Sequence, residues 1–569
     1  MTQNTVSLGS YLASRLRQIG LGHYFAVPGD YNLVLLDQFL AEPGLAYVGC
    51  CNELNAGYAA DGYARAKGVA AAVVTYSVGS LSIINAIAGA SAEDLPVILI
   101  AGGPGTTAKA ENRHLHHTQG GVDYDYCREI FGRLVAESVV IHSLDDAPSL
   151  IDHALTTALA RKQPVCIEVP CDLAGLPVPA PQAFDFSREI PADPGALESA
   201  IAAAAAILDG AKRPVLVAGP KLRRAGAIEA FRKLAEALNA PVAVMPDAKG
   251  FFPEAHPLAI GHYWGPVSSP GCAEVVESAD ACLFAGALFT DYTTVGYTLP
   301  LEHHRILDAK PGLVTLPGST HTGVDLAAFL EALAGRVRSE EDGPETRRPR
   351  KAAPPEVVPG AVLTTRAMMG QVQALLGPET VVVAETGDSW FNGLKLDLPE
   401  GAGFEIQMTY GSIGWSVGAT LGLAIGHGPG RRVVALIGDG SFQLTAQEVS
   451  TMIRQETRPI IFLINNQGYT IEIQIHDGPY NNIQDWDYAG LMAVFSRGGG
   501  KGWGKRVGTE GELAEAIVFA KSHDGPCLIE CLIDRDDCSE ELRTWGTRVA
   551  AFNGRRPSSI PEGSAFSSL

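Results

Sequence analysis

Two polar residues stand at the ends of two apolar runs in the last third of the sequence. Asp439 follows the run 433–437 within a Gly-Asp-Gly turn, and Asn466 follows the run 460–464. Because the strands of a βαβ unit run parallel, both residues should emerge at the same edge of a sheet. A carboxylate, an amide oxygen and a backbone carbonyl form the oxygen-only set that Mg²⁺ takes together with diphosphate oxygens. The pattern therefore predicts a metal-assisted diphosphate site.

The stretch between the two runs indicates a helix, because Phe442, Ala446, Val449 and Ile453 recur at helical spacing. Gly440 would let a ligand approach the backbone, and the amide groups that open such a helix attract an anion. A plain strand, turn and helix explains the Gly-Asp-Gly turn taken alone. The Asn-Asn pair after the next strand favours the diphosphate site instead.

The combination of this turn with the Asn-Asn pair resembles the fingerprint of thiamine diphosphate enzymes. The resemblance implies that Asp439, Asn466 and the backbone carbonyl of Gly468 hold a Mg²⁺ ion. That ion would bind the diphosphate of the cofactor.

A second segment, CCNELNAGYAADGYARAKG, resembles the helix that activates the cofactor in these enzymes, and Glu53 is its acid. A carboxyl group that shares a proton with the pyrimidine of the cofactor must be desolvated to keep that proton near neutral pH. Apolar Cys50, Cys51 and Leu54 surround Glu53 in the sequence. Taken in isolation, Glu53 would suit a first-turn residue favoured by the helix dipole.

Further segments narrow the resemblance to the pyruvate decarboxylases, which are thiamine diphosphate-dependent 2-oxo-acid decarboxylases. They are VPGDYNLVLLD (27–37), TYSVGSLS (75–82), LHHTQG (115–120), AETGDSWFN (384–392), YGSIGWSVGA (410–419) and GYTIEIQIHDGPYNNI (468–483). The resemblance covers essentially the whole chain. It implies non-oxidative decarboxylation of pyruvate to acetaldehyde and CO₂ through a cofactor ylide and an enamine. The alternative is a decarboxylase of larger 2-oxo acids such as phenylpyruvate or indolepyruvate.

In that family an Asp, two adjacent His and a Glu surround the reacting carbon, and they correspond to Asp30, His116, His117 and Glu472. Carboxyl and imidazole groups in a dry pocket can supply and remove the protons that a carbanion requires. Taken alone, Asp30 would suit a helix N-cap and Glu472 an exposed strand or helix position. A metal site at the His pair is disfavoured, because no carboxylate or Cys accompanies it at ligand spacing.

The same resemblance implies further contacts to the cofactor. Gly411 would offer its carbonyl to the pyrimidine amino group, and Ile413 would hold the two rings in a V shape, although Ile413 also suits an ordinary core. The remaining expected cofactor neighbours are Thr386, Asp388, Gly440 and Ser441.

Four bulky residues correspond to positions near the substrate in this family: Tyr292, Trp390, Ile471 and Ile475. Large side chains there leave room for a methyl group and not for a phenyl ring. Relatives that act on phenylpyruvate or indolepyruvate tend to have smaller residues at the Trp390 and Ile471 positions. The resemblance therefore predicts pyruvate as the substrate.

These residues must be positioned by several domains, because two proline-containing stretches without apolar periodicity, 171–194 and 338–360, divide the chain. Each third alternates short continuous apolar runs with helical patterns, which is typical of parallel sheets covered on both faces. We expect three doubly wound α/β domains at 1–190, 191–355 and 356–569. The middle third contains no catalytic constellation.

The composition restricts the partners. The formal net charge of the 569 residues is −20, which disfavours nucleic acid and anionic membranes. The uncharged run 68–92 is long enough to span a membrane, but its polar residues indicate a buried strand, a turn and a helix. Ten scattered cysteines without a CxxC pair, and no secretory signal, suit free thiols in the cytoplasm.

The resemblance also predicts self-association as a homodimer or homotetramer. In the family one subunit supplies the Glu53 side of the cofactor and another supplies the metal side. A catalytically silent relative serving as a scaffold is disfavoured, because Glu53, Glu472 and Asp439 are all present.

Overall fold

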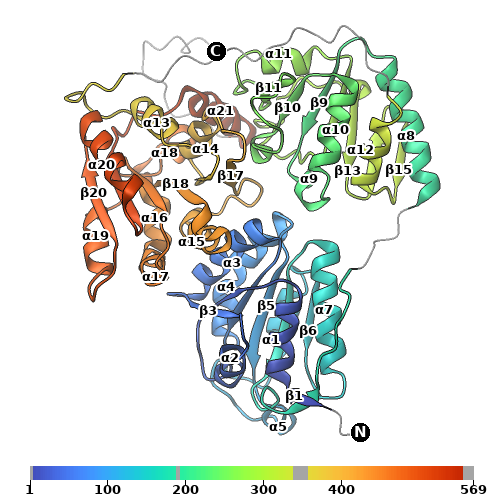
Figure 1. The fold of residues 1–569 in the computed structure, drawn as a ribbon, viewed down its shortest axis with the longest axis vertical. Helices are drawn as coiled ribbons and strands as arrows, with labels where there is room; N and C mark the ends of the chain where they lie inside the picture. The colour runs from blue at the N-terminus through green and yellow to red at the C-terminus, as the bar shows by residue number, and fades with distance from the viewer. Residues whose placement is uncertain (1–3, 188–192, 338–355, 555–569) are drawn as a thin grey trace.

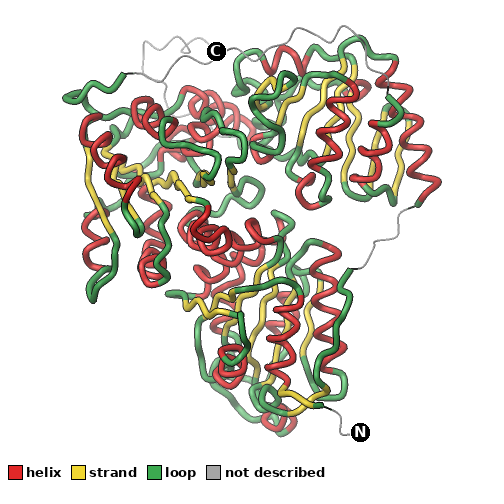
Figure 2. The backbone as a smooth tube through the Cα atoms, viewed as in Figure 1, coloured by secondary structure: helices red, strands yellow, loops and turns green. Residues whose placement is uncertain are grey.

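The computed structural model describes residues 4–187, 193–337 and 356–554, which form three α/β units (Figure 1). In each unit helices flank a central sheet (Figure 2). The predicted α/β class is confirmed, with one large, mainly parallel sheet in each unit. Both predicted domain boundaries, after residues 190 and 355, fall at residues outside the described ranges.

The N-terminal unit contains six parallel strands in the order β3-β2-β4-β5-β7-β6. The strands are β2 (His23–Ala26), β3 (Ala46–Gly49), β4 (Ala70–Val74), β5 (Val97–Gly103), β6 (Glu137–Val140) and β7 (Val165–Pro170). The helices are α1 (Leu8–Gln18), α2 (Leu33–Leu40), α3 (Glu53–Lys67), α4 (Val78–Ala92), α5 (Thr106–Ala110), α6 (Tyr126–Phe131) and α7 (Ala147–Arg161). The uncharged run 68–92 forms β4, a turn and α4, as predicted.

Part of the predicted linker 171–194 is regular structure. Strand β8 (Pro177–Pro179) pairs antiparallel with β1 (Thr5–Ser7) at the start of the chain. The prolines of this stretch hid the strand, because proline is tolerated in such a short edge pairing but weakens a strand pattern.

The middle unit contains seven strands in the order β11-β10-β9-β12-β13-β14-β15, of which the last two continue antiparallel. The strands are β9 (Pro214–Ala218), β10 (Val242–Val244), β11 (Ala259–His262), β12 (Ala281–Ala285), β13 (Ile306–Lys310), β14 (Leu313–Leu316) and β15 (Ser319–Thr322). The helices are α8 (Pro194–Asp209), α9 (Lys221–Arg224), α10 (Ile228–Leu238), α11 (Cys272–Glu277) and α12 (Leu326–Ala334). The parallel part of this sheet was expected, and the antiparallel addition was not.

The C-terminal unit contains six parallel strands in the order β17-β16-β18-β19-β21-β20. The strands are β16 (Thr380–Ala384), β17 (Gly403–Ile406), β18 (Arg432–Gly438), β19 (Ile460–Asn465), β20 (Trp503–Val507) and β21 (Cys527–Leu532). The helices are α13 (Thr365–Gln373), α14 (Asp388–Leu394), α15 (Trp415–His427), α16 (Asp439–Thr445), α17 (Val449–Arg454), α18 (Thr470–Ile475), α19 (Tyr488–Phe495), α20 (Glu510–Ser522) and α21 (Glu540–Phe552).

Helices α3 and α15 join the N-terminal and C-terminal units. A Cβ atom added to Gly62 would lie 2.2 Å from the carbonyl oxygen of Ala419, and one added to Gly422 would lie 1.9 Å from that of Ala59. Only glycine fits at these two crossing points, so the small residues of both helices allow their backbones to touch.

An ionic network at the same joint includes the middle unit. Arg65 lies 2.7 Å from Asp61 and 3.2 Å from Glu405, which also pairs with Arg223 at 2.8 Å. These residues belong to α3, β17 and α9, so the network ties the three units together. Each guanidinium group is paired with carboxylates, so the attraction between the opposite charges offsets the cost of removing them from water. An isolated buried charge would have no such compensation.

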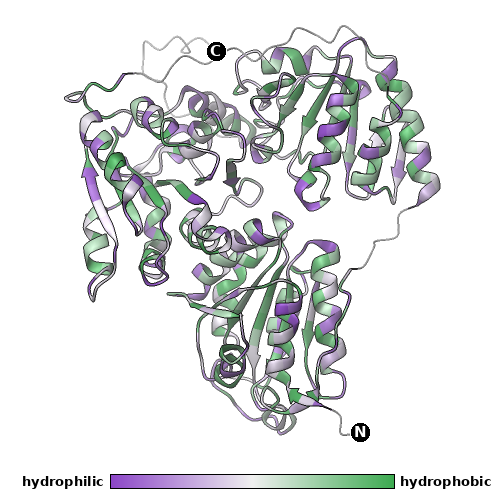
Figure 3. Ribbon diagram, viewed as in Figure 1, coloured by the Kyte–Doolittle hydropathy of each residue, from purple (hydrophilic) through white to green (hydrophobic). Residues whose placement is uncertain are grey.

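Most strands of the three sheets are apolar, whereas the flanking helices carry polar outer faces (Figure 3). No helix in the described ranges is both long enough and apolar enough to cross a bilayer. All ten cysteines are unpaired thiols, as predicted.

Candidate active site

A cavity of about 350 Å³ lies at the carboxyl ends of the C-terminal strands β16, β18 and β19. Eleven of the predicted site residues line it: Tyr292, Thr386, Asp388, Gly411, Ile413, Gly440, Ser441, Asn466, Gly468, Ile471 and Glu472. The ends of neighbouring parallel strands meet at one sheet edge, which is why segments far apart in the sequence converge here.

Three predicted metal ligands lie together at this edge. Asp439 opens α16 and is fully buried, and its Oδ2 accepts a hydrogen bond of 2.6 Å from the amide of Gln467. One atom of the Asn466 amide group lies 3.3 Å from Asp439 Oδ1 and 3.1 Å from the carbonyl oxygen of Gly468. That atom either donates to both as nitrogen or faces both as oxygen.

The second orientation of the Asn466 amide group fits a cation. Three oxygens would then converge with no hydrogen between them, and octahedral Mg²⁺ at 2.0–2.1 Å separates adjacent ligand oxygens by about 2.9 Å. Burial raises the pKa of Asp439 to about 6, although the surrounding backbone amides oppose this shift. A cation would offset the burial of this carboxylate, so the residues present fit Mg²⁺.

Two glycines allow close backbone approaches around these ligands. A Cβ atom on Gly440 would lie 2.4 Å from the ring of Tyr469, and one on Gly468 would lie 2.4 Å from the carbonyl oxygen of Asn481. Any side chain at either position would displace the turn that carries Asp439 or the loop that carries Asn466.

Asp388 is anchored from the C-terminal segment of the unit. It accepts a hydrogen bond of 2.7 Å from Asn392, and both the amide and the hydroxyl of Ser539 donate to it. Burial raises the pKa of Asp388. Ser539 also caps α21, so this contact links the cavity wall to the last described helix.

Glu472 and the buried Ile471 on α18 both line the cavity, whereas Ile473 and Ile475 on the same helix are buried away from it. Burial, followed by the charge of Glu472, raises the pKa of Tyr292, which also lines the cavity. An acid therefore stands beside an aromatic and aliphatic wall.

Two of the expected substrate neighbours, Trp390 and Ile475, are buried in the core instead of lining the cavity. Trp390 is fully buried, and a Cβ atom on Gly411 would lie 3.9 Å from its ring. Its ring also meets Tyr292 edge to face at 6.1 Å. Trp390 thus supports the wall that Gly411 and Tyr292 form.

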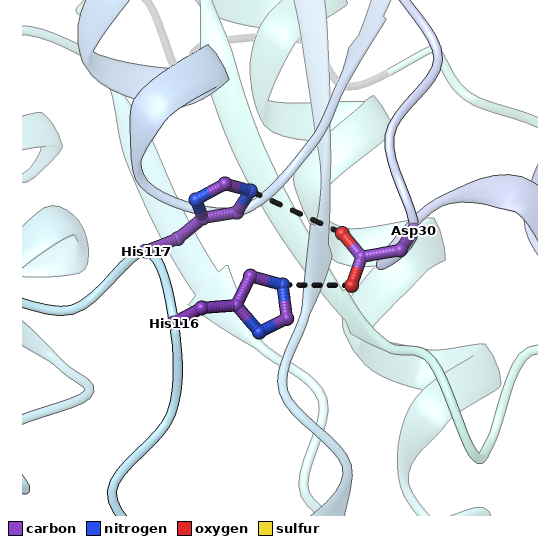
Figure 4. Close-up of side chains that lie close together, drawn as sticks. All are labelled: Asp30, His116 and His117. Carbon is purple, nitrogen blue, oxygen red and sulfur yellow. Dashed lines mark ion pairs between the residues drawn. The ribbon is translucent and has the colours of Figure 1, made fainter.

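The remaining predicted catalytic residues lie in the N-terminal unit. Asp30 Oδ2 is 2.7 Å from His116 Nε2, and Asp30 Oδ1 is 4.0 Å from His117 Nε2 (Figure 4). Tyr31 stacks on His116 with ring centres 4.8 Å apart. The Asp30 and His116 side chains are 55% and 57% exposed, so this group lies at the surface of the chain and outside the cavity.

The sequence argument against a metal at the His pair was wrong in one respect, because the fold does bring a carboxylate to it. One ligand atom from each of Asp30, His116 and His117 lies within 4.8 Å of the others. The same arrangement equally serves proton transfer between a carboxylate and two imidazoles.

Glu53 opens α3, where the side chain of Asn52 caps the helix. The Oε1 atom of Glu53 lies close to Gly79 at the start of α4, because a Cβ atom added to this glycine would be 3.1 Å from it. Glu53 does not line the cavity of its own chain. The predicted site is therefore divided between an N-terminal group and a C-terminal cavity.

Twelve residues that line the cavity were not predicted: Thr365, Met368, Met369, Gly387, Ser389, Asn392, Leu436, Gly438, Ile464, Tyr469, Thr470 and Asp537. The first three come from α13 and the last from the segment before α21, and neither stretch contains a motif. Ser389 and Asn392 fall within the quoted AETGDSWFN segment, so the resemblance contained a signal for them that was not used.

Three family models match the chain. They describe the N-terminal TPP binding domain, the central domain and the C-terminal TPP binding domain of thiamine pyrophosphate enzymes, at residues 6–125, 201–311 and 389–531. Thiamine pyrophosphate is another name for thiamine diphosphate. The fold is thus that of a thiamine diphosphate enzyme, which confirms the predicted cofactor.

Curated relatives define a narrower group. Pyruvate decarboxylase 4 of Arabidopsis thaliana is 50% identical over 98% of this chain and 94% of its own length. Pyruvate decarboxylase 1 of Pisum sativum is 50% identical over 97% of this chain and 94% of its own length. The chain belongs to the pyruvate decarboxylase family, as the sequence predicted.

A solved structure shows the same fold. It is a putative thiamin diphosphate-dependent enzyme isolated from Mycobacterium smegmatis, with a TM-score of 0.75 and 23% sequence identity. The match covers 93% of this chain and 99% of that chain.

Proposed function

We propose that this protein decarboxylates pyruvate to acetaldehyde and CO₂ without oxidation, using thiamine diphosphate and Mg²⁺. The observation that carries the proposal is one cavity that is lined by Asn466, Gly468 and the acid Glu472, with the buried Asp439 carboxylate 3.3 Å behind the Asn466 amide group. The oxygens of Asp439, Asn466 and Gly468 suit a metal-bound diphosphate, and Glu472 suits a proton transfer beside it. Membership of the pyruvate decarboxylase family supports the same reaction.

Bound thiamine diphosphate supplies the electron sink that decarboxylation of a 2-oxo acid needs. Asp439, Asn466 and the Gly468 carbonyl would hold Mg²⁺ against its diphosphate. Gly411 and Ile413 would hold its rings. Glu472 would deliver a proton to the reacting carbon or remove one from the adjacent hydroxyl, since a positioned carboxyl group can act as a general acid or base.

The apolar wall of the cavity favours a small substrate. Ile471 and Tyr292 line it, and Trp390 stands directly behind Gly411. One additional ring on the substrate would require these buried or half-buried side chains to move, which costs packing energy. This arrangement supports pyruvate over an aromatic 2-oxo acid.

The protein would act as a homodimer or a larger assembly in which Glu53, Asp30 and the His pair of one chain complete the cavity of another. Asp30 and His116 are more than half exposed, and none of the four residues lines the cavity of its own chain, which supports this part of the proposal. The N-terminal unit also exposes large apolar side chains: Leu33, Val34, Leu40, Tyr47 and Val78. Analytical ultracentrifugation with and without cofactor should give at least a dimer, and a persistent active monomer would exclude a shared site.

A cytoplasmic location belongs to the same proposal, because ten unpaired cysteines suit a reducing compartment. Fractionation of the native cell with an antibody would test it. Recovery in an oxidising compartment would contradict it.

The activity is tested by incubating purified protein with thiamine diphosphate, Mg²⁺ and pyruvate, and following acetaldehyde with alcohol dehydrogenase and NADH. Phenylpyruvate under matched conditions serves as the comparison. Cofactor-dependent turnover that strongly favours pyruvate is expected. A preference for phenylpyruvate would overturn the substrate assignment, and inactivity on both would overturn the function.

A further inference from the structure

Glu385 is a carboxylate buried directly beneath the cavity. It follows strand β16, is 0% exposed and precedes Thr386, which lines the cavity. Among the described residues its partners are hydrogen-bond donors, and it forms no ion pair with a Lys, Arg or His. Burying a carboxylate is costly unless hydrogen-bond donors surround it, so the position requires an explanation.

The donors come from two separate segments of the cavity wall. The Oε1 atom of Glu385 accepts a hydrogen bond of 2.7 Å from the amide of Thr386. Oε2 accepts three hydrogen bonds: one of 3.1 Å from the amide of Gly414, one of 3.1 Å from the amide of Ser416 and one of 2.6 Å from the hydroxyl of Ser416. One oxygen therefore holds the segment that begins at Thr386, and the other holds the segment that begins α15.

The second oxygen acts as an N-cap supplied from a distant strand. Helix α15 begins at Trp415 after Gly414, which has φ 87° and no capping side chain of its own. The free amide groups and the dipole of a helix N-terminus favour a negative charge there. Glu385 provides that charge, although burial raises its pKa and the donors oppose this shift.

The loop before α15 carries the two residues assigned to the rings of the cofactor, Gly411 and Ile413. The first half of this loop is held by the N-terminal unit. The Ser412 hydroxyl lies 2.6 Å from the Tyr58 hydroxyl and accepts a hydrogen bond of 2.9 Å from the side chain of Asn85. The last residue of the loop, Gly414, is held by two hydrogen bonds. Its amide donates to Glu385, and its carbonyl oxygen accepts a hydrogen bond of 2.7 Å from the hydroxyl of Thr445. Glu385 alone among these groups also holds Thr386.

We propose that Glu385 is a positioning residue that sets the spacing between Thr386 and the Gly411–Ile413 loop, and so pre-organises the wall that receives the cofactor. The inference rests on the proposed assignment of that wall to thiamine diphosphate. A carboxylate is required, because two oxygens must accept from donors on both segments at once. An amide would offer one oxygen and would turn its own hydrogens towards the donors of the other segment.

The test is cofactor affinity of the Glu385→Gln variant, measured from the fluorescence of the protein's tryptophans as thiamine diphosphate is titrated into metal-loaded, cofactor-free protein. Loss of a group that orients a site residue costs about 10- to 100-fold in affinity or activity. We expect the Kd for thiamine diphosphate to rise by that factor, and kcat at saturating cofactor to fall. The KM for pyruvate should stay within about twofold, since uniform substrate binding is untouched.

Glu405→Gln is the matched control. Glu405 is also a buried carboxylate of the C-terminal unit, but its partners are Arg65 and Arg223 at the joint between the units. It should lower Tm without changing the Kd for the cofactor. An equal rise in Kd for both variants would reduce Glu385 to a general structural role and overturn the inference.

Ser416→Ala gives a second variant should Glu385→Gln fail to fold. It removes only one hydroxyl donor, so a smaller rise in Kd is expected. In the double variant the two effects should be less than additive, because both act through one contact. An unchanged Kd in every folded variant would overturn the inference.

Asp439→Asn separates this inference from the proposed function. If Asp439→Asn loses cofactor affinity and Glu385→Gln does not, only the positioning role fails. If Asp439→Asn binds the cofactor as the unaltered protein does, the assignment of the cavity itself fails, and the positioning role fails with it.

Discussion

The N-terminal and C-terminal sheets share one strand order and present different chemistry at the same edge. In both, the second strand of the unit is outermost, followed by the first, third, fourth, sixth and fifth. At the C-terminal edge the fully buried Asp439 lies behind Asn466 and Gly468, which line a cavity, whereas at the N-terminal edge Asp30 and His116 are more than half exposed. We therefore propose that the C-terminal sheet provides an anchoring edge, which also carries Glu472, and that the N-terminal sheet provides a proton-transfer edge with Glu53, Asp30 and the His pair. The following changes should separate the two edges.

Removing the predicted metal ligand of the anchoring edge should have the largest effect on activity and on cofactor binding. Asp439→Ala deletes the carboxylate, and we expect activity to fall by more than about 100-fold together with loss of bound cofactor. Equilibrium dialysis of thiamine diphosphate with Mg²⁺ measures the loss. Retained cofactor binding would show that the C-terminal edge is not the anchor.

Variants of the proton-transfer residues should lose turnover and keep cofactor binding. Glu53→Gln keeps the shape of the side chain and removes the acid, so turnover should fall by about 10²- to 10⁴-fold while cofactor binding persists. Glu472→Gln should lower turnover within the same range, after substrate has bound. Steady-state kinetics beside the same dialysis provide the readout. Undiminished turnover of either variant would refute the role of that residue.

A smaller change at the cavity wall should alter substrate choice and leave the anchor intact. Ile471→Ala removes a buried aliphatic side chain that lines the cavity. We expect the ratio of kcat/KM for phenylpyruvate over pyruvate to rise by about 10- to 100-fold, the scale at which apolar pockets discriminate. Competition between the two substrates measures it, and an unchanged ratio would remove Ile471 from the pocket.

The middle unit should affect stability and not chemistry. Burial, followed by the charge of Glu93, raises the pKa of Asp247 from 3.8 to about 7, and no other residue of the described ranges donates a hydrogen bond to its carboxylate oxygens. Because the pKa is higher in the folded state, the ionised group destabilises the fold, from no effect near pH 4 to the full effect above pH 7.

Asp247→Asn should therefore raise Tm at pH 8 and change it little at pH 4. The pKa difference corresponds to at most about 4 kcal/mol at 1.36 kcal/mol per unit. Thermal unfolding at both pH values is the measurement, with turnover as the control. A gain in Tm that is equal at both pH values would show that ionisation of Asp247 is not its cause.

The sequence was sufficient for the anchoring edge because local rules fix it. Asp439 and Asn466 end consecutive parallel strands, and the handedness of a βαβ unit places such residues side by side. Asp30 and His116 are far apart in the sequence, and no spacing rule joins them. Only the resemblance to the family brought them together before the fold was known.

Other features depend on contacts that no sequence pattern encodes. The position of Glu472 on α18 was open between strand and helix, because its alternation with Ile471 and Ile473 suits both. Glu385 was not singled out, because its partners Gly414 and Ser416 lie on another segment and meet it only in three dimensions. The burial of Trp390 behind Gly411 likewise follows from packing and not from residue type.

The most direct test of the division between two edges uses two variants that are each inactive. Glu53→Gln damages only the proton-transfer edge, and Asp439→Ala damages only the anchoring edge. When the two proteins are co-expressed with different tags and the mixed assembly is isolated, one intact pair of edges should form between the chains. The account predicts that acetaldehyde production from pyruvate returns in that assembly. A mixed assembly as inactive as its parents would contradict it.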